Sequence, residues 1–288
     1  MQEFIIVQVL NSWAYSMLLF VLALGLSLTF GLLRFVNLAH GSFFLIGGYV
    51  GATMLSRSGS FALAALAGAA AAALTGFLLE RAVLRHFYKR SDLDQVIMSF
   101  GCALILGEAI TILGGKDIRG ITLTGVLGQT LSFAGIQYPL YRLLIGIAGL
   151  VLFAAVWLIF ERTRLGALVR ASVDDGTMVG GLGYDVRLLY TGVFALGALL
   201  AGLSGIIGAP VIGLYPGLDL EILITTLVVV VVGGLGNIFG AFWAAILIGT
   251  CETFGRTLLP QVASMLTFCL MAAVLLVRSI GRFEEEIE

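Results

Sequence analysis

Charged residues are scarce in this sequence. They make up 11% of its 288 residues, whereas hydrophobic residues make up 60%; a soluble globular domain carries about 25% charged residues. The mean hydropathy of +1.08 is too high for a chain that keeps its surface in water. No stretch is polar enough to form a soluble domain. The composition therefore argues against a soluble enzyme and indicates an integral membrane protein.

Residue types that perform catalysis or bind metals are also rare. The chain has 2 histidines, and its 3 cysteines lie inside apolar runs without metal-ligand spacing or a disulfide pattern. It contains neither a nucleotide-binding loop nor the Gly-x-Ser-x-Gly motif of a nucleophile elbow. We therefore expect no catalytic residues, no metal site and no cofactor bound by this chain. The net charge of −1 provides no basic surface for nucleic acid.

Apolar runs long enough to cross a bilayer recur along the chain. A helical span needs roughly 20 mostly apolar residues. We predict an all-α fold, a polytopic membrane helix bundle that forms one domain over residues 1–288, with about eight membrane segments. The N-terminus has no basic region and no cleavage site, so we expect no removable signal peptide. The segments are expected at residues 9–33, 35–55, 61–79, 96–113, 143–160, 188–212, 221–250 and 258–277.

The run over residues 221–250 is long for one helix. It is interrupted by Gly233, Gly234, Gly236 and Asn237. We predict two half-helices that meet at this break and form a re-entrant segment. A broken helix at membrane depth is tolerated only where protein or a water-filled cavity covers the loose backbone. The four residues are therefore candidates for the wall of a pathway, and close helix packing is the alternative.

The distribution of lysine and arginine gives an orientation. These residues gather mainly over 81–90 and 162–187, and basic residues favour the cytoplasmic side of a membrane. Placing both clusters in the cytoplasm puts the N-terminus outside and requires the run over 221–250 to enter and leave on the outer side. A single full span there is the alternative, and it places the C-terminus outside together with Arg278 and Arg282.

The polar block over residues 161–187 is too polar to span and too long for a tight turn. We expect Asp174 and Asp175 near the start of a short helix, where acidic side chains suit the helix dipole, and glycines near Gly183 at its end. Such a helix on the inner membrane face would present polar groups to a partner's groove. An ordinary solvated loop is the alternative. The candidate residues of the block are Arg164, Gly166, Arg170, Ala171, Asp174, Asp175, Leu182 and Gly183.

Two further places carry polar residues inside apolar surroundings. His40 is interpreted as part of a polar cap with Asn37 and Ser42 at the inner start of the second segment, with a proton relay or ligand as the alternative. The same stretch includes Gly41. Glu108 is flanked by apolar residues, and an ionisable residue in a membrane segment is a functional-site candidate. A position near the outer interface, from which the side chain reaches water, is the alternative. Asn37, His40, Gly41 and Glu108 therefore join the pathway candidates.

Several motifs occur in a fixed order along the chain. They are Ser12-Trp13-Ala14-Tyr15 with residues 25–31, Asn37-Leu38-Ala39-His40-Gly41-Ser42 with residues 46–50, the polar block over 164–184, and the glycine-rich break within 225–241. Together, from near residue 8 to residue 280, they resemble the permeases of ATP-binding-cassette importers for branched-chain amino acids, in particular the LivH-type transmembrane subunit. The polar block departs from the family pattern at Gly180 and Gly181.

The resemblance implies a function in transport. The chain would be a permease subunit in the cytoplasmic membrane of a bacterium or archaeon, with a coupling loop over residues 161–187. Its partners would be membrane lipid, a second related permease, two cytoplasmic ATPase subunits that carry ATP and Mg²⁺, and an extracytoplasmic solute-binding protein. Branched-chain amino acids are the expected cargo, with other amino acids, urea, amides and aromatic acids left open. A self-sufficient secondary transporter or channel is the alternative function.

Overall fold

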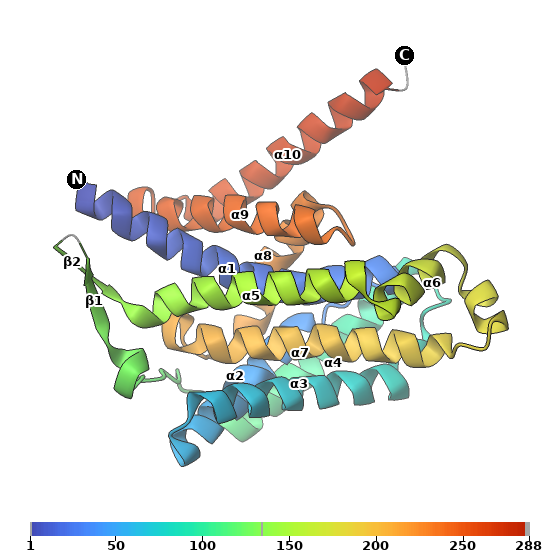
Figure 1. The fold of residues 1–288 in the computed structure, drawn as a ribbon, viewed down its shortest axis with the longest axis horizontal. Helices are drawn as coiled ribbons and strands as arrows, with labels where there is room; N and C mark the ends of the chain where they lie inside the picture. Colours follow the sequence, from blue (N-terminus) through green and yellow to red (C-terminus); the bar gives the residue numbers. More distant parts are fainter. Residues whose placement is uncertain (1, 134, 286–288) are drawn as a thin grey trace.

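The computed structural model describes residues 2–133 and 135–285 of the chain. These residues form a bundle of α-helices with two short 3-10 turns and one small β-hairpin (Figure 1). The elements are α1 (Gln2–Leu33), α2 (His40–Ser58), α3 (Phe61–Ala82), η1 (Leu84–His86), α4 (Asp92–Gly114), η2 (Gly125–Gly128), β1 (Thr130–Phe133), β2 (Ile136–Pro139), α5 (Leu140–Arg162), α6 (Arg164–Gly181), α7 (Val186–Ile212), α8 (Leu218–Gly233), α9 (Ile238–Leu258) and α10 (Ala263–Glu285).

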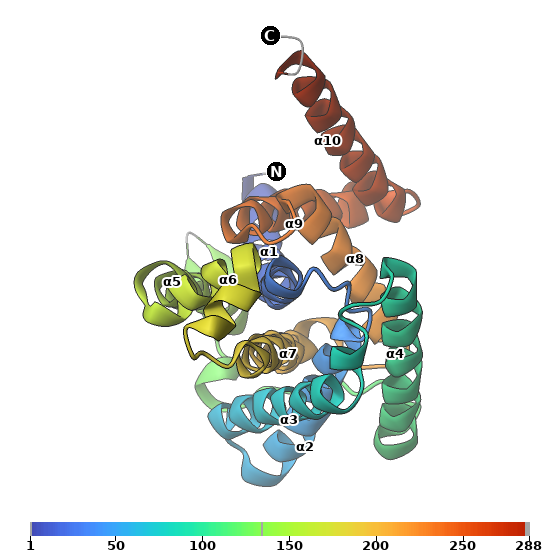
Figure 2. The ribbon, with the colours of Figure 1, turned by 90° about the vertical axis from the view of Figure 1, so that its right-hand side faces the viewer.

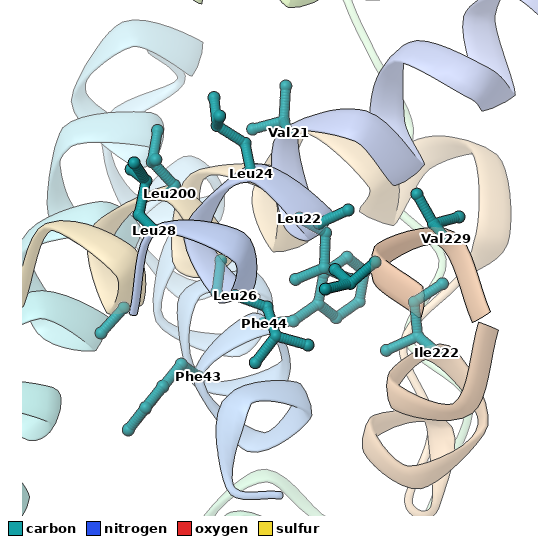
Figure 3. Packing of buried hydrophobic residues seen from close by; sticks show 14 of the residues in the cluster. Val21, Leu22, Leu24, Leu26, Leu28, Phe43, Phe44, Leu200, Ile222 and Val229 are labelled. Carbon is teal, nitrogen blue, oxygen red and sulfur yellow. The ribbon is translucent and has the colours of Figure 1, made fainter. Parts of the chain in front are cut away.

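Helix α1 is the central element of the bundle. It packs against α5, α7, α8 and α9, and 83% of its apolar span is buried within the protein. Figure 2 shows α1 surrounded by other helices when the bundle is viewed from one end. Its leucines meet Phe43 and Phe44 of α2, Leu200 of α7 and Ile222 of α8 (Figure 3). The core is therefore built around a helix that is apolar on all sides, as a buried membrane helix should be.

Glycine allows the helices around α1 to approach closely. A Cβ atom at Gly47 of α2 would lie 2.2 Å from the backbone of Gly202 in α7, and one at Gly205 would lie 1.9 Å from the carbonyl oxygen of Phe44. Helices in a membrane associate through such close packing because lipid provides no hydrophobic drive between them. Glycines at these positions thus supply contact surfaces between the helices of the bundle.

Six helices of the described chain are long and apolar enough to cross a membrane. They are α1, α3, α4, α5, α7 and α9, so the predicted number of about eight segments is not reached by length and composition alone. The second predicted run began at residue 35, but helix α2 begins at His40. The reason is that Arg34 adopts a left-handed conformation with φ of 49°, which ends α1 and leaves the apolar residues after it non-helical.

The predicted break in the run over 221–250 is present as a turn between two helices. Helix α8 ends at Gly233 and α9 begins at Ile238. Gly234 and Gly236 have φ values of 94° and 78°, a conformation that favours glycine. The Asn237 side chain accepts a hydrogen bond from the Gly240 amide at 2.9 Å and so caps α9. The course of this pair relative to a membrane stays a prediction.

The two ends of the bundle carry different structural elements. One end carries α6, η1 and the turn between α8 and α9, which contacts Gly31 near the end of α1. The opposite end carries the N-terminus and the hairpin of β1 and β2, whose strands pair antiparallel from Thr130–Pro139 to Phe133–Ile136 (Figure 1). This hairpin was not predicted within the connector over residues 114–139.

Candidate functional site

Helix α6 forms most of the polar block and is anchored to the end of α5. Gly166 lies so close to α5 that a Cβ atom there would be 1.8 Å from the carbonyl oxygen of Phe160. The Arg170 guanidinium donates a hydrogen bond to the same carbonyl and lies 3.7 Å from the Glu161 carboxylate. These contacts cap the end of α5 and fix the direction in which α6 leaves it.

A kink at Asp175 divides α6 into two parts. Asp175 has φ of −149° and ψ of 90°, which is not helical. Its Oδ1 accepts hydrogen bonds from the backbone amides of Thr177 at 2.9 Å and Met178 at 3.0 Å. Asp175 is therefore the N-cap of a second, short helix. This agrees with the expected helix start near Asp174 and Asp175, although helical structure already begins at Arg164.

The short second helix exposes apolar side chains. Met178 is 66% exposed, and Leu182 and Tyr184, just beyond its end, are 68% and 53% exposed. Val179 faces inward and is buried, and Gly183 has a φ of 89° that turns the chain toward α7. Of the other predicted residues, Arg164, Ala171 and Asp174 lie exposed on the first part of α6. The polar block therefore presents an apolar ridge within a polar surface, which is a surface suited to a protein partner.

Aromatic side chains connect the kink of α6 to the interior. Gly176 lies beside the hydroxyl of Tyr190 in α7. The Tyr190 ring meets the ring of Tyr88 edge-on at 6.2 Å, and Tyr88 meets Phe35 at 5.6 Å. The Tyr88 hydroxyl also donates a 2.9 Å hydrogen bond to the buried Glu80 carboxylate. Burial, and then the nearby Glu80 charge, raise the pKa of Tyr88, so its phenol remains a donor.

The start of α2 is a buried polar cluster, but its hydrogen bonds differ from the predicted cap. Asn37 Oδ1 accepts a bond from the Ala39 amide at 3.0 Å, as a cap would. The His40 ring instead lies with Nε2 3.0 Å from the carbonyl oxygen of Leu22 in α1. Ser42 turns toward α4 and α8. The interpretation of His40 and Ser42 as capping groups is wrong, because α2 begins against two neighbouring helices that offer them other partners.

Helix α8 begins beside this cluster and brings a carboxylate that the sequence analysis missed. A Cβ atom at Gly41 would lie 2.0 Å from the carbonyl oxygen of Asp219. The Ser42 hydroxyl lies 3.1 Å from Oδ2 of Asp219 and 3.3 Å from the Ala103 carbonyl. Asp219 is 5% exposed. Its position two residues before Glu221 was the signal available in the sequence, since both acids open the same apolar run.

A cavity of about 600 Å³ lies between α4 and α8. Asp219 lines it together with Glu108, which lies on the exposed side of α4, and Lys116, which follows the end of α4. Apolar side chains such as Leu104 and Ile118 complete the lining. The structure therefore brings Glu108 into the same region as Gly41 and the start of α8.

The glycine-rich break lies at the other end of α8. Gly233 is about 21 Å from Asp219 at about 1.5 Å per residue of helix. The break packs α8 against α9, since a Cβ atom at Gly240 would lie 1.8 Å from the Gly233 carbonyl oxygen. Gly236 touches Gly31 of α1. The predicted pathway residues therefore form two groups. One group, with Gly41 and Glu108, lies near the start of α8, and the other is the glycine-rich break at its end. No group of three or more potential metal ligands occurs in the part of the chain that the structure describes.

The structure is a multi-span bundle with the exposed, kinked helix α6 at one end and a polar cavity between α4 and α8, and its sequence is that of a membrane permease. Residues 8–275 match the family described as "Branched-chain amino acid transport system / permease component". The chain belongs to this family. It is a non-catalytic transmembrane component of an ATP-binding-cassette transport system, in which ATP is hydrolysed by partner subunits.

Relatives of similar length match this chain over nearly its whole length. The chain is 27% identical to the high-affinity branched-chain amino acid transport system permease protein BraD of Pseudomonas aeruginosa, over 95% of this chain and 94% of BraD. It is 23% identical to LivH of Escherichia coli, over 91% and 89%, and 26% identical to a probable LivH of Methanocaldococcus jannaschii, over 93% and 89%. No solved structure matches the chain at a significant level.

Proposed function

We propose that this chain translocates branched-chain amino acids as one of two related permeases in an ATP-driven importer. Two ATPase subunits bind its cytoplasmic face, and an extracytoplasmic binding protein delivers the solute. The family match over residues 8–275 is the observation that carries this proposal. The relatives named for branched-chain amino acid transport cover about the same length, which supports the same role for the whole chain.

Helix α6 is the element that couples the permease to ATP hydrolysis. The anchoring of Gly166 and Arg170 on the end of α5 supports this role, because a force on α6 reaches the bundle through rigid contacts. The exposed Met178, Leu182 and Tyr184 supply the apolar ridge that an ATPase groove would cover. Closure of the ATPases then reorients the helices as rigid bodies and alternates access to the pathway.

The membrane topology follows from the distribution of basic residues. Arg81, Arg85 and Lys89 lie at the end of the bundle that also carries α6 and Arg187. Basic residues favour the cytoplasmic side, so this end faces the cytoplasm and the hairpin of β1 and β2 faces outward. Helices α8 and α9 form one re-entrant pair. With α2 and α10, the six apolar spans then give about eight membrane segments.

The cavity between α4 and α8 is part of the translocation pathway. His40 at the start of α2 contacts Leu22 of α1. Counted from Leu22 to Leu33 at about 1.5 Å per residue, this contact lies about 16 Å along α1 from its C-terminal end. Asp219 lies beside this start and so within the membrane. Charged groups at such depth face water or protein and not lipid. The second permease therefore covers this face, and the pathway runs between the two chains.

Deletion of the gene for this chain in its source organism provides the test. We expect loss of ATP-dependent uptake of labelled leucine, isoleucine and valine, and its return with a plasmid copy. A second strain, in which the Gly166→Trp variant replaces the chain, should also lose uptake, because a side chain there collides with Phe160 and displaces α6. Unchanged uptake in the deletion strain, with no other leucine importer induced, would refute the proposal.

A further inference from the structure

Asp219 is a buried carboxylate with no cationic partner in the described part of the chain. It is 5% exposed, and neither ion pair recorded among the described residues includes it. Its recorded hydrogen bond comes from Ser42, whose single hydroxyl proton is shared with the Ala103 carbonyl. The first turn of α8 stabilises a negative charge through the helix dipole. A hydroxyl and a dipole offset only part of the cost of burying a carboxylate, and buried charges in proteins are normally paired.

The surroundings of Asp219 leave space for such a partner. Gly107 of α4 faces the carboxylate, and a Cβ atom there would lie 3.0 Å from Oδ2. Asp219 also lines the cavity of about 600 Å³ between α4 and α8. The carboxylate therefore lies at the wall of an open space and not in a closed core.

The cavity contains charges of both signs. Glu108 and Asp219 are acidic, and Lys116 is basic and exposed. Lys116 follows the end of α4, which lies about 10 Å along the helix from Gly107 at about 1.5 Å per residue. Leu104, Ile118 and Leu220 provide apolar surface between them. A small zwitterion with an apolar side chain matches this lining: its ammonium group suits Asp219, and its carboxylate suits the lysine.

We propose that the cavity between α4 and α8 is a site for the zwitterionic head of the transported amino acid, with Asp219 as the group that binds its ammonium. This proposal rests on the transport function proposed above and names the group of this chain that contacts the solute. Ser42 holds the carboxylate in place, and Lys116 attracts the solute carboxylate at the outer rim. Glu108 lines the same cavity from the exposed side of α4.

Uptake by cells that carry the complete importer gives the first test. We expect Asp219→Asn, which keeps the shape and the acceptor for Ser42, to lower leucine uptake at least tenfold, since a charge-assisted hydrogen bond is lost. Lys116→Gln should lower it about two- to fivefold. Glu221→Gln is the matched control, because Glu221 shares the first turn of α8 but binds the Tyr215 hydroxyl at 2.6 Å; its uptake should stay within twofold. Equal uptake for Asp219→Asn and the control would overturn the proposal.

A second measurement detects binding without transport, so it separates this site from the importer function. A Glu108→Cys variant in a background with Cys251→Ser and Cys269→Ser is purified with its partner subunits but without the binding protein, and its reaction with a thiol reagent is timed. We expect millimolar leucine to slow the reaction at least threefold, 4-methylpentanoate to have no effect, and Asp219→Asn to remove the protection. Equal slowing by leucine and 4-methylpentanoate, or none by either, would refute ammonium binding at Asp219. Protection without any ATP-driven uptake by the wild type would retain the site and refute the importer function.

Discussion

Asp175 is exposed, but its side chain caps the second, short helix of α6. Its side chain accepts the amides of Thr177 and Met178 and so begins the short helix that carries the apolar ridge. Replacing it with alanine removes both acceptors. Loss of an N-cap costs about 1 kcal/mol, which lowers the ratio of folded to unfolded short helix about fivefold. Because a helix this short is marginally stable by itself, its folded population falls by a similar factor. Since the ridge is presented only by the folded helix, Asp175→Ala should weaken ATPase binding by a similar factor.

Three substitutions of Asp175 distinguish the effect of helix capping from the effect of its negative charge. Asn caps a helix about as well as Asp but carries no charge, so Asp175→Asn should bind the ATPase subunits within twofold of the wild type. Asp175→Ala should bind about fivefold more weakly, and Asp175→Lys at least as weakly as Asp175→Ala. The assay is titration of the purified membrane complex, stripped of its ATPases, with the soluble ATPase subunits. Thermal unfolding of the bundle should be unchanged in all three, because Asp175 is exposed.

The relative ATPase affinities of the three variants decide between capping and charge as the role of Asp175. If Asp175→Asn binds as weakly as Asp175→Lys, the charge itself contacts the ATPase and the capping argument is wrong. If all three bind like the wild type, the part of α6 beyond the kink does not contact the ATPase.

Two further substitutions test the packing on which the site depends. Gly41→Ala would place a Cβ atom 2.0 Å from the Asp219 carbonyl oxygen, so we expect a loss of about 1–3 kcal/mol in the free energy of unfolding, measured by thermal unfolding in detergent; Gly101→Ala, with nothing within 4 Å, is the control and should change nothing. Tyr88→Phe removes the recorded donor to the buried Glu80, whose second oxygen finds no partner among the described residues, so we expect a loss of about 1–3 kcal/mol. An unchanged melting temperature for either variant would contradict the packing described here.

The sequence predicted the features that leave a compositional signal. Hydropathy located the apolar runs, because a membrane helix must present apolar side chains along its length. Glycines marked the turn between α8 and α9, because positive φ values at Gly234 and Gly236 require them. Acidic residues marked the kink of α6, because Asp175 caps a helix there.

Other features depend on contacts between distant residues and could not be predicted in this way. The stretch after Arg34 is apolar yet not helical, since its shape depends on packing between α1 and α2. The His40 ring finds its partner in Leu22, which no local pattern indicates. Asp219 became a candidate only when Gly107 and Ser42 of two other helices were placed beside it. The prediction of a re-entrant α8 and α9 pair depends on where the membrane lies.

The proposed assembly is tested most directly by gentle purification of the tagged chain from its native membrane, followed by mass spectrometry of intact complexes. We expect one copy of this chain together with a second multi-span permease and two copies of soluble ATPase subunits, and loss of those ATPases when α6 is displaced by Gly166→Trp. Recovery of this chain alone, or as a homo-oligomer without ATPases, under conditions that preserve a known importer from the same membrane, would contradict the account and favour a channel or secondary transporter.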